Sequence, residues 1–131
     1  MTPPATPDGT WIETTIYNFT AINGDGAFPT AGLVMDKNGV LYGTTTYGGS
    51  ATSGSPCFYY GPTGCGTAFA LTPPATPGGD WSETILHSFT GQNGEGSVPM
   101  TGLSLNSSGA LFGTTSAGGT AGKGTIFAIN P

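Results

Sequence analysis

The sequence predicts an all-β protein, and three observations lead to this class. Glycine and proline, with 24 and 11 residues in a chain of 131, divide the sequence into short segments separated by turns. The segments between them are rich in threonine, aromatic and β-branched residues, which favour strands over helices. Nearly the whole chain also consists of two copies of an internal sequence repeat, which predicts two copies of one small antiparallel unit.

The repeat aligns residues 2–49 with 72–119 at a constant shift of 70 positions, as from Leu41 to Leu111. The phrase "LYGTTTYGG" in the first copy becomes "LFGTTSAGG" in the second. The first copy then carries an insertion, 50–65, after which "GTAFALTP" matches "GTIFAINP" at the end of the second copy. We therefore expect one repeat domain, 1–131, built from two units that differ by one loop.

Each unit contains short apolar segments separated by turn signals. Asn38-Gly39 and Ser108-Gly109 are suited to the tight turn after the first strand of each unit. Alternation of apolar and polar residues predicts an antiparallel meander. The expected strands are 29–36, 40–46, 67–72 and 81–90 in the first unit, and 99–106, 110–116 and 125–130 in the second.

A four-stranded meander repeated at this spacing is typical of a β-propeller blade. Blade 1 would span 29–90 and blade 2 would span 99–130, which lacks a fourth strand. The matching closing strand, 11–20, stands at the other end of the chain. Because propellers need about four to eight blades, we expect a cyclic homo-oligomer in which each closing strand completes a neighbour's blade 2. A trimer is favoured, with a tetramer or a dimer as alternatives.

The charge balance excludes several partners. The net charge is −5, and the only cations are Lys37 and Lys123, too few to neutralise the phosphates of a nucleic acid or an anionic membrane surface. No apolar run is long enough to insert into a membrane. The N-terminus lacks a signal-peptide pattern, so we expect a mature or excised piece with a start methionine.

Two cysteines, Cys57 and Cys65, lie within the insertion. Two thiols are too few for a four-ligand zinc site. Their spacing suits a local disulfide that pins a long loop, which would imply an oxidising compartment. The alternative is a pair of free thiols in a flexible loop.

At this point the sequence resembles a known family. The residues that carry the resemblance are "GDGAFPTAGLVMDKNGVLYGTTTYGG" (24–49) with "GTAFALTP" (66–73), and their second copies at 94–119 and 124–131. They resemble the Gloeo/Verruco (GloVer) repeat, which occurs in tandem in bacterial surface and secreted proteins. The resemblance implies an exported, extracellular or cell-surface bacterial protein with propeller-like architecture, and it implies no chemistry.

The repeated acids Asp25 and Glu95, in "NGDG" and "NGEG", are weak candidates for calcium ligands. Each motif offers about two side-chain ligands where calcium takes six to eight, so a tight turn is the preferred interpretation. We expect no metal and no cofactor.

Catalysis is not expected. Glu13 and Glu83 recur two residues after a tryptophan, but equivalent places in adjacent blades are too far apart for a glycosidase pair. His87, which aligns with Tyr17, has no catalytic partner pattern and is expected to be a half-buried polar residue. A glycoside hydrolase or lyase remains the third alternative.

The candidate ligand-binding residues are aromatic. Trp11 and Trp81 could stack on sugar rings, or instead anchor the fourth strand of each blade. Phe58, Tyr59 and Tyr60 lie on the insertion and could form an exposed binding surface or cap the propeller. We therefore expect a non-catalytic structural or adhesive module, with a multivalent lectin that binds glycans as the alternative.

Overall fold

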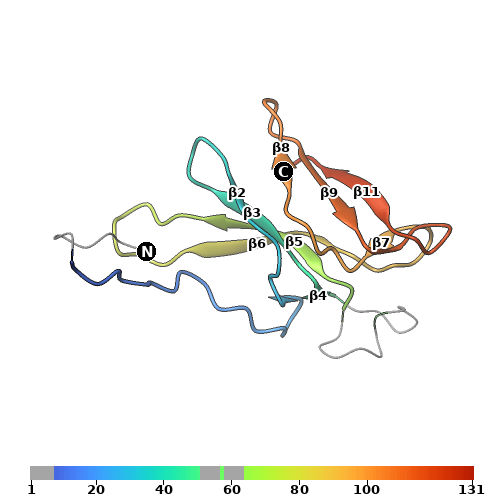
Figure 1. Cartoon of the computed structure of the whole chain (residues 1–131), viewed down its shortest axis with the longest axis horizontal. Coiled ribbons are helices and arrows are strands. Elements are labelled where there is room, and N and C mark those ends of the chain that lie inside the picture. Colours follow the sequence, from blue (N-terminus) through green and yellow to red (C-terminus); the bar gives the residue numbers. More distant parts are fainter. Residues whose placement is uncertain (1–7, 51–56, 58–63) are drawn as a thin grey trace.

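The computed structural model describes residues 8–50, 57 and 64–131. Within these ranges the chain forms strands and no helix, and each pair of strands runs antiparallel. The prediction of an all-β, antiparallel protein is therefore confirmed. No closed ring of blades is formed by the described residues of this single chain (Figure 1).

The first unit forms a four-stranded meander, which we call the first sheet. It contains β2 (Val34–Met35), β3 (Leu41–Thr45), β5 (Thr67–Thr72) and β6 (Ser82–Ser88), in the order β2-β3-β5-β6 (Figure 1). The second unit forms the second sheet, which has three strands. These are β8 (Ser104–Leu105), β9 (Leu111–Thr115) and β11 (Thr125–Ile129), in the order β11-β9-β8.

Two smaller ribbons tie loops onto these sheets. β1 (Gly26–Ala27) pairs with β4 (Tyr47–Gly48), and β7 (Gly96–Ser97) pairs with β10 (Ala117–Gly118). In each unit, the ribbon joins the loop that contains the turn acid to the glycine-rich segment that follows the repeated "GTT" sequence. Both units therefore fold by the same local plan.

The first strand of each unit is much shorter than the sequence predicts. Phe28 and Val98 have positive φ angles of 56° and 58°, a conformation that turns the backbone away from the strand direction. The carbonyl of Phe28 accepts a hydrogen bond from Thr46 N at 3.0 Å, and that of Val98 accepts one from Ser116 N at 3.1 Å. The chain therefore reaches its pairing position only at β2 and β8.

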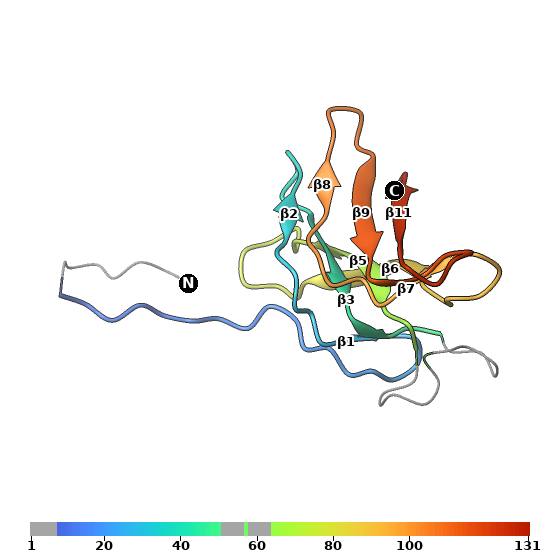
Figure 2. The same cartoon turned by 45° about the vertical axis from the view of Figure 1, so that its right-hand side comes forward.

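Residues 11–20, which we call the arm, belong to none of the strands in the described chain. The arm is mostly exposed, and Figure 2 shows it, in blue, projecting away from the two sheets. Contacts near its end anchor it: Tyr17 donates a hydrogen bond to Glu83 of β6, and Phe19 packs edge-on against Phe69 of β5, with ring centroids 5.0 Å apart. Phe89, at the equivalent place after β6, packs in the same way on Phe127 of β11, at 4.9 Å.

The two sheets pack against each other to form the main core. Tyr42 and Ala70 of the first sheet are buried against Leu103 and Leu111 of the second unit. Thr44 Oγ1 also donates a hydrogen bond to the Thr101 carbonyl at 3.1 Å, so the contact is both apolar and polar. This packing is the single junction between sheets that the described chain completes.

The repeated phrase forms part of the scaffold. Thr45 and Thr67 are fully buried, and their hydroxyl oxygens lie 2.8 Å apart across β3 and β5. Thr115 and Thr125 repeat the pair at 2.9 Å across β9 and β11. Because each hydroxyl network also accepts a backbone N–H, the buried polar atoms are satisfied within the strands.

Candidate functional site

The predicted ligand-binding residues fall in different places. Trp11 is 58% exposed on the arm, whereas Trp81 is half-buried just before β6. Trp81 and Asp80 line an open groove together with the 74–79 loop and arm residues 14–16, and Trp11 is not among the lining residues. Phe58, Tyr59 and Tyr60 lie outside the described residues.

Cys57 and Cys65 form a disulfide, with Cα atoms 5.2 Å apart. Both cysteines are buried and pack with Ala68 and Phe89 beneath the loops of the first unit. The bond therefore ties the middle of the insertion to its end, two residues before β5, and the sequence-based prediction of a disulfide is confirmed.

The acids of the repeated turn serve the backbone in both units. Asn23-Gly24 and Asn93-Gly94 all have positive φ, and each pair occupies the centre of a tight turn. Asp25 Oδ2 accepts hydrogen bonds from Thr20 N at 2.5 Å and Thr20 Oγ1 at 2.7 Å. In the described part of the chain, no group of three or more His, Cys, Asp or Glu side chains could hold a metal ion.

A polar cluster links the arm to β6. The Tyr17 hydroxyl donates a hydrogen bond to Glu83 Oε2 at 2.8 Å, and Asp25 lies close to both side chains. Glu83 Oε1 and Asp25 Oδ1 are buried, and neither has a hydrogen-bond partner among the described residues. Burial and the nearby Asp25 carboxylate raise the pKa of Glu83, although the Tyr17 hydrogen bond opposes this shift.

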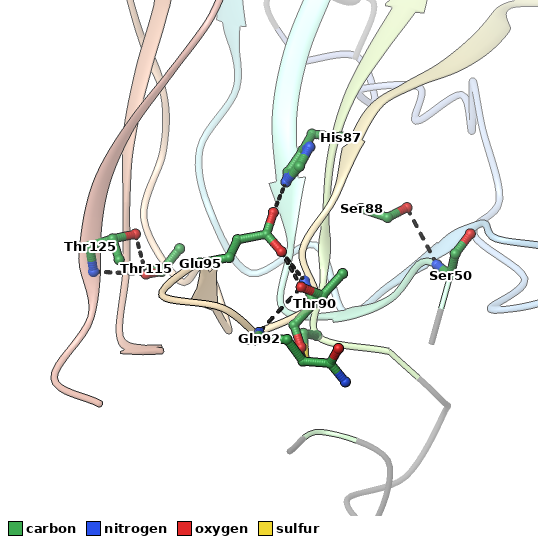
Figure 3. A network of polar contacts seen from close by, with 9 residues as sticks. Ser50, His87, Ser88, Thr90, Gln92, Glu95, Thr115 and Thr125 are labelled. Carbon is green, nitrogen blue, oxygen red and sulfur yellow. Dashed lines mark hydrogen bonds and ion pairs between the residues drawn. The ribbon is translucent and has the colours of Figure 1, made fainter. Parts of the chain in front are cut away.

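An equivalent cluster in the second unit replaces tyrosine with histidine. His87 Nε2 pairs with Glu95 Oε1, and Glu95 Oε2 accepts a hydrogen bond from Thr90 N at 3.0 Å (Figure 3). Burial tends to raise the pKa of Glu95, but the Thr90 hydrogen bonds and His87 outweigh it and lower that pKa. No third acid corresponding to Glu83 joins this pair within the described chain.

The His87–Glu95 pair borders a groove beside the free edge of β11. Within the described residues β11 pairs only with β9, whereas the equivalent strand β5 pairs with both β3 and β6. The groove is lined by His87, Phe89, Glu95, Thr125, Phe127 and Ile129, among others. It therefore lies at the place that β6 fills in the first unit.

The outer faces of the two sheets are apolar and uncovered. On the second sheet, Phe112 is 41% and Ile126 is 84% exposed, whereas their equivalents Tyr42 and Ala68 are 9% and 0% exposed. We call Phe112, Thr114, Ile126 and Ala128 the trailing face. On the first sheet, Leu33 is 53% exposed, whereas its equivalent Leu103 is 9% exposed. We call Pro29, Ala31 and Leu33, which border an apolar hollow above Phe69 and Leu71, the leading face.

Sequence reasoning missed the pairing of His87 with Glu95 and the uneven burial of equivalent positions. The recurrence of threonine five residues before the turn acid, at Thr20 and Thr90, is a sequence signal for the threonine–acid hydrogen bonds but not for the histidine pairing. Uneven burial leaves no such signal, because equivalent positions carry similar residues and differ only in what covers them.

No known protein-family model matches the chain, and neither a curated protein nor a solved structure matches it significantly. The resemblance to the GloVer repeat therefore stays an expectation from the sequence. Among the described residues, no helix is long and apolar enough to cross a membrane.

Proposed function

We propose that this chain is an exported, non-catalytic binding scaffold that assembles head-to-tail into a cyclic β-propeller. The observation that carries the proposal is the uneven burial of equivalent positions. Tyr42, Ala70 and Leu103 are buried at the junction between the two sheets of one chain, whereas their counterparts Phe112, Ala128 and Leu33 are exposed on the trailing and leading faces. A further copy of the same junction would cover both faces.

The junction within the chain supplies the template for that contact. Tyr42 and Ala70 pack on Leu103 inside the chain, and the corresponding contact between copies would bring Phe112 and Ala128 onto Leu33. The two faces differ, so the contact is heterologous and generates a ring if its rotation closes. A three-subunit ring would contain six blades, within the range of known propellers.

The disulfide supports the exported location, because such bonds persist in oxidising compartments. The chain has only two cations, which supports a role that involves neither binding to anionic lipids nor binding to nucleic acids. The expected role is structural or adhesive, with the insertion presented once in each subunit.

Mixing two complementary variants tests the head-to-tail assembly. Leu33→Asp disables the leading face and Ile126→Asp disables the trailing face, so each variant alone is expected to be monomeric by native mass spectrometry. An equimolar mixture should form 1:1 dimers and nothing larger, because only one intact face of each kind remains. Ile22→Asp is the matched control, since Ile22 is 64% exposed but belongs to neither face. A monomeric mass for the unaltered chain at micromolar concentration contradicts the proposal.

A second candidate function is glycan binding, and the open groove with Trp81 and Asp80 favours it. An indole face can stack on a sugar ring while the carboxylate accepts hydroxyl hydrogen bonds. Ring assembly would multiply the weak sites and raise the apparent affinity. A glycan array with the unaltered chain and Trp81→Ala tests this function, and no binding at high protein concentration leaves the scaffold alone.

A further inference from the structure

We propose that the groove beside β11 receives the arm of a second copy, with Glu13 of the partner subunit bound to His87, so that assembly is favoured by mild acid. This inference rests on the proposed head-to-tail assembly and specifies its register and its regulation.

The sequence of the arm matches the strand that fills the equivalent place. The arm reads "WIETTIYNFT" and residues 81–90, which include β6, read "WSETILHSFT". Glu13 thus corresponds to Glu83, and Tyr17 corresponds to His87. Because β6 pairs with the whole length of β5, the arm is suited to the same pairing on β11.

The path of the chain sends the arm to another subunit. β6 pairs with β5 of the first sheet, and its end then crosses to the second sheet, where Phe89 packs on Phe127. Phe19, at the end of the arm, makes the equivalent contact with Phe69 of the first sheet. By analogy with β6, the rest of the arm would pair with the sheet that precedes the first sheet in a ring. The exposed side of the arm is therefore placed to face the second sheet of a preceding copy, and Figure 2 shows the arm extending away from the two sheets of its own chain.

The first sheet also fixes the expected register. Glu83 lies opposite Leu71, Thr84 opposite Ala70, and Ile85 opposite Phe69. On the second sheet, Glu13 of the partner subunit would lie opposite Ile129, and Thr14 of the partner subunit opposite Ala128. A strand shifted by one residue would turn the opposite set of side chains toward the groove.

This register brings a second carboxylate to His87. In the first unit, the Tyr17 hydroxyl donates a hydrogen bond to Glu83 Oε2 at 2.8 Å, and the Asp25 carboxylate lies beside this pair. The corresponding group between subunits is His87, Glu13 of the partner subunit and Glu95. The other residues that line the groove are uncharged, and they include Thr125, Phe127 and Ile129 of β11.

The charge of this cluster determines the direction of the pH effect. A protonated imidazole between two carboxylates is attracted to both, whereas a neutral imidazole leaves two carboxylates close together. Assembly therefore takes up a proton, and it weakens as the pH rises and that proton is lost. In stronger acid the carboxylates themselves become protonated and the attraction is lost.

Sedimentation equilibrium at pH 5.5 and pH 8.0 tests the regulation. We expect the subunit contact of the unaltered chain to weaken by roughly tenfold or more between pH 5.5 and pH 8.0, because one linked proton changes the association constant by up to about tenfold per pH unit. Glu13→Gln and His87→Gln should each remove this difference, whereas the matched surface control Asp8→Asn, at an exposed carboxylate outside the arm, should retain it. Oligomers with equal affinity at both pH values overturn this inference and leave the proposed function standing. Monomers at both pH values overturn the two together.

Cross-linking between separately made chains tests the register. Thr14→Cys mixed with Ala128→Cys should give a covalent heterodimer on mild oxidation. Ile12→Cys mixed with Ala128→Cys is the matched control, displaced by two residues along the same strand face, and should give much less. Equal yields, or a higher yield from the displaced pair, contradict the register.

Discussion

Gly43 lies directly opposite Phe69 in the β3–β5 pair, and the aromatic ring occupies the space above the glycine. A Cβ at Gly43 would stand 2.7 Å from Phe69 Cζ, closer than any real packing contact. Gly113 has the same relationship to Phe127, at 2.5 Å. The glycine in the middle of each repeated phrase therefore exists to seat the phenylalanine that receives Phe19 or Phe89.

Gly43→Ala is expected to destabilise the chain by about 1–3 kcal/mol, because the added methyl group must displace both Leu33 and the packed ring of Phe69. Urea unfolding followed by tryptophan fluorescence measures the free energy of unfolding. Gly32→Ala is the matched control, since a Cβ at Gly32 meets nothing within 4 Å. Equal losses in the two variants would show that the change in backbone freedom, and not the contact with the ring, sets the cost.

Thr45→Val is expected to cost about 1–3 kcal/mol, because it leaves the buried Thr67 N–H and hydroxyl without their shared partner. Valine keeps the shape of threonine, so the loss reports the hydrogen bonds alone. Thr72→Val, at the exposed end of β5, should change stability by less than about 0.5 kcal/mol. A neutral Thr45→Val variant would contradict the structural role of the paired hydroxyls.

Glu83→Gln should stabilise the chain at pH 7 relative to the unaltered protein. The pKa of Glu83 is raised by burial and by Asp25, so its stabilising contribution is complete in acid and is lost as the pH rises through that raised value. A glutamine still accepts the Tyr17 hydrogen bond and can donate to the unpartnered Asp25 oxygen.

Urea unfolding at pH 4 and pH 7 checks this expectation, and the advantage of Glu83→Gln should shrink at pH 4. Glu95, whose lowered pKa gives the opposite pH trend, is present in both proteins and cancels from the comparison. Asp80→Asn serves as the surface control. An advantage that is the same at both pH values would rule out ionisation of Glu83 as its cause.

Replacing both Cys57 and Cys65 with serine should lower the free energy of unfolding by about 2–4 kcal/mol. The disulfide ties the middle of the insertion to its end and packs beside Ala68 and Phe89, so its loss removes a covalent constraint and loosens this packing. Reduction of the unaltered chain with dithiothreitol should produce a similar loss. Unchanged stability in both experiments would show that the bond constrains the insertion without supporting the fold.

The repeat made most of the architecture predictable, because a strand identified in one copy could be checked against the other. The strand boundaries at 29–33 failed for a physical reason: Phe28 and Val98 adopt positive φ, which tertiary contacts impose on residues that do not prefer it. The register shift between Ala68 and Phe69 opposite β6 was also missed, because bulges depend on the partner strand.

The candidate site was predictable only in its parts. Glu13 and His87 stood out in the sequence as a repeated acid and a single imidazole. Their proposed meeting depends on the crossing of the arm from one sheet to the next, which the Phe19–Phe69 contact makes visible. The sequence repeat alone cannot show which of two equivalent residues is exposed to solvent in the folded chain.

The substitution of tyrosine by histidine between equivalent places has a consequence for how such a ring would come apart. Tyr17 meets Glu83 inside one chain, whereas His87, which pairs with Glu95 of its own chain, would meet Glu13 only between chains. A ring of identical subunits would thus contain two kinds of seam in alternation, and only one kind would respond to a mild change of acidity. Mildly alkaline pH would weaken the ring at the interfaces between subunits and not at the junction within each chain. The products would be folded two-sheet monomers that can reassemble.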